Sequence, residues 1–193
     1  MCRSFLFQSP VILYCAILLL VSGCTSTAQI VPINPNPRVE ASDPASSRRT
    51  LALDIIDARA NEIIGYRDGT SASALRSTPE LMRNLRRALE NGYSERGFQV
   101  LSAGEAADIT MEIRLTEISY AREPDGLLRD LATGVTFEVT SIMPEKTVTA
   151  TYRDGQTKDT LLPLSRAANA ELINQHMNKA LNNLLNDVRL TVP

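Results

Sequence analysis

Three stretches in the second half of the chain alternate between apolar and polar residues. Apolar residues fall on every second position over 109–115, 135–139 and 148–152, with threonine or a charged residue between them. Successive side chains of a strand point to opposite faces, so this period predicts strands of a sheet with one apolar and one polar face. The polar face is expected to carry Thr110, Glu112, Arg114, Thr136, Glu138, Thr140, Thr147, Thr149 and Thr151.

Further strand and turn signals complete the predicted sheet. The segment 51–56 carries another alternating pattern, and 63–66 predicts a short strand after it. The apolar register shifts by one residue before Ile118, which predicts a β-bulge. The proline-glycine segment at 124–126 predicts a break, and the Asp-Gly pair at 154–155 predicts either a tight hairpin or the end of a strand.

Two segments have the period and the end signals of amphipathic helices. The first begins near Pro79, carries a leucine-rich stripe and stops at Gly97, which can adopt a left-handed conformation. The second runs from Ser165 to about Leu190 and has an apolar side. Its other positions carry the asparagines Asn174, Asn178, Asn182, Asn183 and Asn186. The predicted fold is therefore α+β, an antiparallel sheet of about four to five strands with two helices packed on one face.

The N-terminus has the three parts of a secretory signal. Arg3 supplies a positive charge, 11–21 is an unbroken apolar run, and small residues follow it. The run is too short to span a membrane, which takes roughly 20 apolar residues. The segment ending in Gly23 and Cys24 resembles the lipobox of bacterial lipoproteins. This resemblance implies cleavage after Gly23 and acylation of Cys24.

The segment after this cysteine has the composition of a linker. Four prolines lie among small and polar residues. They are Pro32, Pro35, Pro37 and Pro44. We therefore expect residues 1–23 to be a signal peptide, 24–49 to be the lipidated cysteine and a tether, and 50–193 to be one α+β domain. Thr25 follows the cysteine, and by resemblance to lipoproteins of double-membrane bacteria it implies sorting to the outer membrane, with the domain facing the periplasm.

Charge and residue counts exclude several classes of function. The signal carries one of the 20 basic residues and none of the 22 acidic ones, so the mature chain has a net charge of −3. It has no basic block for nucleic acid. One cysteine and one histidine are left in the mature chain, which excludes a Cys/His metal cluster and a Cys–His catalytic pair. Nothing in the sequence indicates a cofactor.

The most concentrated polar group lies near a strand end. Asp54 and Asp57 are three positions apart and are expected on opposite faces of the strand. Asp57 and Arg59 share a face, and we predict an ion pair that fixes the following turn rather than a catalytic pair. His176 is predicted to be a surface or interface residue of the last helix, since no G-x-S-x-G motif accompanies it. The arginines of the first helix are interpreted as a solvated face: Arg83, Arg86 and Arg87.

The segment 57–65, with the sequence DARANEIIG, is similar to the YajG family of outer-membrane lipoproteins. The similarity extends to the order of lipobox, proline-bearing tether, strand ending in D-x-R, leucine-rich helix and terminal helix. It implies a localisation and a fold, and it brings no catalytic, cofactor or metal residues. We treat Asp57, Arg59 and Gly65 as a structural motif and Cys24 as the lipidation site.

These observations predict a non-enzymatic envelope protein, held to the membrane by acyl chains on Cys24, that binds or assembles with another envelope protein. The polar face of the sheet is the expected contact surface. Two alternatives stay open. One is a periplasmic hydrolase or carbohydrate-modifying enzyme that uses Asp54, Asp57 or Glu138, which needs carboxylates converging in a cleft. The other is a carrier of an amphiphile, which needs an apolar cavity between helices and sheet.

Overall fold

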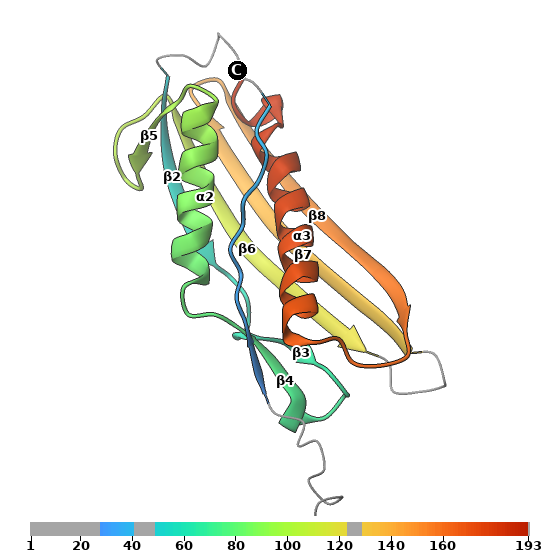
Figure 1. The fold of residues 1–193 in the computed structure, drawn as a ribbon. Helices are drawn as coiled ribbons and strands as arrows, with labels where there is room; N and C mark the ends of the chain where they lie inside the picture. The colour runs from blue at the N-terminus through green and yellow to red at the C-terminus, as the bar shows by residue number, and fades with distance from the viewer. Residues whose placement is uncertain (1–27, 41–48, 123–128, 193) are drawn as a thin grey trace, which may run out of the picture.

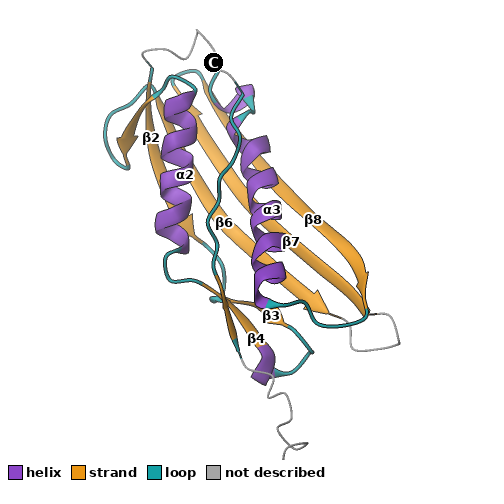
Figure 2. Cartoon of the chain, in the orientation of Figure 1, coloured by secondary structure: helices purple, strands orange, loops and turns teal. Residues whose placement is uncertain are grey.

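The structure is a computed structural model that describes residues 28–40, 49–122 and 129–192. These residues form one sheet with two helices packed against it (Figures 1 and 2). The strands are β1 (Gln29–Val31), β2 (Thr50–Asp57), β3 (Ile63–Tyr66), β4 (Ala74–Ser77), β5 (Gln99–Ser102), β6 (Ile109–Arg122), β7 (Arg129–Met143) and β8 (Lys146–Thr160). The helices are α2 (Leu81–Glu95) and α3 (Arg166–Leu185), and short 3-10 turns occupy Ser71–Ser73 and Val188–Leu190.

The sheet is organised around β6, which pairs with three other strands. On one side, β7 and β8 follow it as an antiparallel meander. On the other side, β2 runs parallel to β6, and β5 runs parallel to β2 beyond it. Near the end of β6, Gly65 of β3 pairs with Tyr120, and the sheet continues from β3 to β4 and β1.

The predicted antiparallel sheet of four to five strands is wrong, because the described residues form eight strands in a mixed sheet. The chain from β2 to β5 passes through α2, and such a crossover joins parallel strands. The prediction also missed β1, β4 and β5, which have only three or four residues. Their sequences, QIV, ALRS and QVLS, are short and show no alternation of apolar and polar residues.

The long strands contain two irregular positions. The register between β6 and β7 shifts between Leu115 and Glu117, which confirms the predicted bulge. The Asp-Gly pair at 154–155 neither turns nor ends the strand, because β8 continues beyond it. Gly155 lies opposite Gly134, and a Cβ at Gly155 would meet the carbonyl oxygen of Thr133 at 2.6 Å. This glycine therefore permits close approach of two strands. The break predicted at 124–126 lies outside the described residues.

Both helices lie on the same face of the sheet, as predicted (Figure 1). Each turns an apolar stripe toward the strands, and the stripes are almost free of solvent contact. Their buried members include Leu81, Leu85, Leu89, Ile173, Met177, Leu181 and Leu184. They meet the inward side chains of the long strands, which include Met111, Ile113, Val135, Phe137 and Val139. The core is thus a single layer of side chains between helices and sheet.

The helix ends follow local signals in part. Gly97, with φ of +98°, follows the last residues of α2, as the sequence predicted. Ser165 precedes α3, and its Oγ accepts a hydrogen bond from the N–H of Ala168. α3 ends at Leu185 instead of Leu190, because Asp187 accepts from the N–H of Arg189 and begins a separate turn.

Residues 32–40 form an extended segment between the two helices (Figure 1), and we call this segment the strap. The stretch expected to be a free linker is therefore folded onto the domain from β1 to the end of the strap. Val31 and Ile33 are fully buried, and alternate strap residues point inward as in a strand. The inward positions include prolines, which are also typical of linkers and so concealed this period. Cys24, Thr25 and Pro44 lie outside the described residues.

Candidate functional site

A ladder of four asparagines, three on α3 and one at its C-cap, holds the strap. The asparagines are spaced by four residues, and each accepts a hydrogen bond through Oδ1 from a backbone N–H of the strap. The pairs are Asn34 with Asn174, Asn36 with Asn178 and Arg38 with Asn182, each at 2.7 Å, and Glu40 with Asn186 at 3.0 Å. Asn174 also donates to the carbonyl oxygen of Pro32 at 3.0 Å. The ladder thus pairs with the strap much as a neighbouring strand would.

The ladder depends on a match between two repeats. Four residues of α-helix rise about 6.0 Å, and two residues of polyproline-like chain rise about 6.2 Å. An asparagine at every fourth helix position therefore meets every second strap residue across all four pairs. Sequence reasoning missed this site. The spacing of four was visible in the last helix, but its partner lies 140 or more residues earlier in the chain.

Because of two prolines, the strap donates backbone hydrogen bonds on one side only, toward α3. Pro35 and Pro37 lack a backbone N–H. The N–H groups of Asn34, Asn36 and Arg38 all bond to α3. From residue 34 to residue 38, the strap therefore has no backbone donor left for α2 or for a further strand.

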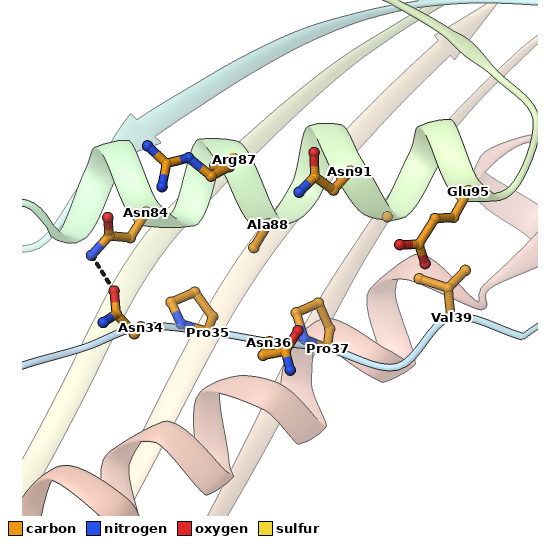
Figure 3. A pocket seen from close by; sticks show the side chains of 11 residues that line it. Asn34, Pro35, Asn36, Pro37, Val39, Asn84, Arg87, Ala88, Asn91 and Glu95 are labelled. Atoms are coloured by element: carbon orange, nitrogen blue, oxygen red, sulfur yellow. Dashed lines mark hydrogen bonds between the residues drawn. The ribbon is translucent and has the colours of Figure 1, made fainter.

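A groove of about 420 Å³ lies between the strap and α2 (Figure 3). Its lining residues are Asn34, Pro35, Asn36, Pro37, Val39, Asn84, Arg87, Ala88, Asn91, Gly92 and Glu95. Asn84 bridges one end, where its Nδ2 donates to Oδ1 of Asn34 at 2.6 Å and to the carbonyl oxygen of Ile33 at 3.1 Å. Amide, guanidinium and carboxylate groups suit a polar ligand, but the lining residues offer no nucleophile with an adjacent base.

Arg59 and Asp57 form a bidentate ion pair at the end of β2. Nε of Arg59 donates to Oδ1 at 2.8 Å, and Nη2 donates to Oδ2 at 2.7 Å. Nη1 donates to Oγ of Ser77 at 3.1 Å, so the guanidinium also reaches the end of β4. The Arg59 side chain is 8% exposed, and its hydrogen bonds lower the pKa of Asp57 below the ordinary value. The ion pair that the spacing predicted is present, and through Arg59 it links the end of β2 to the end of β4.

Gly65 allows β3 to reach the central strand. A Cβ at this position would lie 1.7 Å from the carbonyl oxygen of Tyr120, with which Gly65 is in register. No side chain fits in that space. The third residue of the sequence motif is therefore explained by the contact between β3 and β6.

The carboxylates considered for catalysis do not converge. Asp57 is in register with Leu115, a core residue, and so lies on the face that the helices cover. Asp54 is in register with Glu112 on the opposite face, and these two share a hollow of about 240 Å³. Glu138 lies on that outer face as well, but in register with Arg114. The three carboxylates are therefore divided between two faces of the sheet.

The sequence predicted a surface or interface position for His176, and the surface position is wrong, because His176 is buried between α3 and the sheet. It is 2% exposed, with Nε2 at 2.9 Å from Oγ1 of Thr133 and Nδ1 bonded to Asp154. The order of hydroxyl, imidazole and carboxylate resembles a nucleophilic triad. However, Thr133 is only 5% exposed and His176 only 2%, so two of the three members are almost fully shielded from solvent. The network instead joins α3 to β7 and β8. The apolar neighbours of His176 on the helix were the sequence signal that could have indicated its burial.

The outer face of the sheet has the residues that the alternation predicted. All nine are exposed or half-buried, and α2 and α3 lie on the other side (Figure 1). On the helical side, Arg83 and Arg86 form long ion pairs of 3.9 Å with Glu80 and Glu90. Arg87 lines the groove beside the strap.

Two further properties hold for residues 28–40, 49–122 and 129–192. In these residues, no group of three or more His, Cys, Asp or Glu side chains is placed to hold a metal ion. No helix in the same part of the chain is both long and apolar enough to cross a membrane.

This chain also matches a known family. Residues 35–192, from the strap to the last turn, match the Lipoprotein_16 family model, which is described as an uncharacterized lipoprotein. The chain belongs to the Lipoprotein_16 family. Membership confirms the resemblance to YajG-type lipoproteins and implies a membrane-anchored location in the cell envelope. Among curated proteins, no match to this Lipoprotein_16 chain was found.

Solved structures share the fold of this Lipoprotein_16 protein. Protein XCC0632 from Xanthomonas campestris, of family model DUF330, is 16% identical at a TM-score of 0.50, covering 81% of this chain and 92% of that chain. An uncharacterized protein is 12% identical at a TM-score of 0.50, covering 81% and 97%. A minor lipoprotein from Acinetobacter baumannii is 13% identical, covering 71% and 84%, and its TM-score of 0.36 supports no conclusion. The first two matches show that the fold recurs in distant sequences.

Proposed function

We propose that this Lipoprotein_16 protein is a non-enzymatic binding or assembly module. Acyl chains on Cys24 anchor it to the periplasmic face of the outer membrane, and an envelope protein binds the outer face of its sheet. The observation that carries the proposal is that only one of the two faces of the sheet is covered. Helices and strap cover one face (Figure 2), while the other presents threonine and charged side chains by strand alternation.

The free edge of the sheet supports the same proposal. Among the described strands, β8 pairs with β7 alone, and it is 15 residues long. An unpaired strand edge can accept a strand from another chain. The threonines of β8 that precede its glycine lie on the outer face and give that face stiff, β-branched side chains beside the edge.

Two features weigh against the alternatives of an enzyme and an amphiphile carrier. Of the candidate carboxylates, Asp57 lies on the helical face of the sheet, and Asp54 and Glu138 lie on the outer face in register with different residues of β6. The space between helices and sheet, where an amphiphile would lie, is filled by core side chains such as Phe137, Met177 and Leu181, which are fully buried. The arrangement thus suits binding at a surface better than chemistry or storage in a cavity.

The contact surface can be tested by changing its charge and shape. The double variant Thr149→Arg with Glu138→Lys alters two outward positions and should abolish crosslinks to an envelope partner in cells. Arg83→Glu changes a 68% exposed side chain on α2 and serves as the control, with crosslinks retained. Crosslinks that survive the double variant would place the partner site on the helices or the strap.

The anchor can be tested by mass spectrometry of the mature protein. We expect an N-terminal Cys24 that carries acyl chains, because the sequence before it resembles a lipobox. Two or more acyl chains suffice for durable membrane attachment. Cys24→Ser should leave the protein unprocessed or mislocalised. A mature protein that begins at another residue would contradict the anchor.

A further inference from the structure

Two adjacent leucines protrude from the connection between β8 and α3. Leu161 is 70% exposed and Leu162 is 76% exposed, more than any other large apolar side chain in the described part of the chain. Pro163 follows them, and Leu164 packs against the core. Proline restricts the backbone, and the packed leucine holds the base of the connection. The pair is therefore presented outward on a supported tip.

This tip lies at the end of the domain where the chain enters. Nε of Arg166, in the first turn of α3, donates to the carbonyl oxygen of Ile30 in β1 at 3.0 Å. Nδ2 of Asn169 donates to Oε1 of Gln29 at 3.2 Å. Figure 1 shows the start of β1 and the β8–α3 connection at one end of the molecule, and the C-terminus at the other. Ile30 is itself 51% exposed at this end.

Chain length limits the distance between this end and the lipid. Cys24 precedes Gln29 by five residues. A fully extended chain spans at most about 3.6 Å per residue, so the start of β1 lies within roughly 18 Å of an acylated Cys24. The polar headgroup layer of a bilayer leaflet occupies about 5–8 Å. An anchored domain therefore keeps this end close to the membrane surface.

We propose that Leu161 and Leu162 insert into the interfacial layer of the membrane that holds Cys24. The inference rests on the proposed acylation of Cys24. The leucine pair contacts lipid rather than another protein, because the anchor on Cys24 holds the tip next to the membrane surface and so raises its effective concentration there. Apolar side chains at such a tip bury themselves about 5–10 Å into the boundary between headgroups and acyl chains. Insertion at a second point fixes the orientation of the domain.

The charges around the tip predict little dependence on salt. The charged residues that flank the leucines leave a net charge of only +1: Lys158, Asp159 and Arg166. A cluster of several basic residues, which an anionic surface attracts, is missing from this connection. Insertion should therefore occur equally in zwitterionic and anionic vesicles.

The chain contains no tryptophan, so a single tryptophan can report on the tip. The experiment uses the acylated protein with Leu162→Trp in phosphatidylethanolamine–phosphatidylglycerol vesicles that contain lipids brominated near the headgroup. We expect blue-shifted emission and strong quenching by bromine. The matched control is Val188→Trp, a 52% exposed position in the turn after α3, near the C-terminal end. Its emission should stay unquenched.

The possible results separate the tip from the anchor. Acylated protein that floats with the vesicles while the Leu162→Trp reporter is quenched no more than the Val188→Trp reporter would overturn the insertion and leave the anchor standing. A mature protein without acyl chains would overturn both. A third result is a blue shift of the Leu162→Trp emission that grows with protein density in the membrane but comes without bromine quenching. It would show that a second copy covers the leucines, and it would also overturn the proposal.

Discussion

The backbone N–H of Arg38 donates a hydrogen bond of 2.7 Å to Oδ1 of Asn182, a residue 144 positions later in the chain. This pair is one of four between the strap and α3, and it shows how a proline-containing segment becomes part of the fold. Side chains of the strap alternate between inward and outward positions, and every backbone N–H from residue 34 to residue 38 donates to one helix. The first residues of the domain are thereby held along the length of the last helix.

We predict that Asn178→Ala lowers the free energy of unfolding by about 1 kcal/mol, because one hydrogen bond to the strap is lost. Urea unfolding of the full mature chain measures this change. Hydrogen exchange at the amide of Asn36, which donates to Asn178, should accelerate by about fivefold or more. Asn183→Ala is the matched control, since Asn183 is an exposed neighbour outside the ladder, and it should change neither quantity. Equal effects of the two variants would show that the ladder contributes nothing.

We predict that Gly65→Ala lowers the free energy of unfolding by about 3 kcal/mol or more. A methyl group at this position would clash with the carbonyl oxygen of Tyr120 and push β3 away from β6. Gly69→Ala is the control for backbone strain alone, because Gly69 has φ of +84° and a methyl group there would meet no atom within 4 Å. It should cost about 1 kcal/mol. Similar losses in both variants would contradict the steric explanation.

We predict that Arg59→Ala lowers the free energy of unfolding by about 1 kcal/mol at neutral pH, because Asp57 and Ser77 both lose a nearly buried donor. Arg59→Lys should recover less than half of the loss, since an ammonium cannot replace the bidentate contact. The pKa of Asp57 is lowered in the folded state. Its contribution is therefore present above its unfolded pKa of about 4 and disappears as the pH falls below that value. A difference between variant and parent that persists in acid would point to packing instead.

We predict that Asp187 contributes to the loss of stability in acid. Hydrogen bonds from Arg189 and from the hydroxyl of Tyr152 lower the pKa of Asp187 to about 2. Since the folded pKa lies below the unfolded value, the stabilisation is complete above about pH 5 and is lost as the pH falls toward 2. Asp187→Asn should reduce the pH dependence of the free energy of unfolding by about 1 kcal/mol over this range. Asp159→Asn, on the exposed part of β8, is the control and should leave the profile unchanged.

Local patterns in the sequence were sufficient for much of the fold. Alternation predicted the outward residues of β6, β7 and β8, and a one-residue shift predicted the bulge after Leu115. Gly97 marked the end of α2, and the spacing of Asp57 and Arg59 indicated their ion pair. Each of these features depends on residues close together in the chain, so backbone sterics and side-chain period determine it.

The tertiary structure alone decided the features that join distant segments. Parallel pairing of β2 with β5 and β6 depends on a crossover through α2, and the burial of His176 depends on Thr133 and Asp154 in two other strands. The strap is the clearest case, because its prolines are equally compatible with a free linker until asparagines on α3 meet its N–H groups. Isolated segments of this length gain too little from local hydrogen bonds to offset their conformational entropy. The sequence by itself therefore determined the long strands, the two helices and their apolar faces, whereas packing determined the short strands β1, β4 and β5 and which segments became partners.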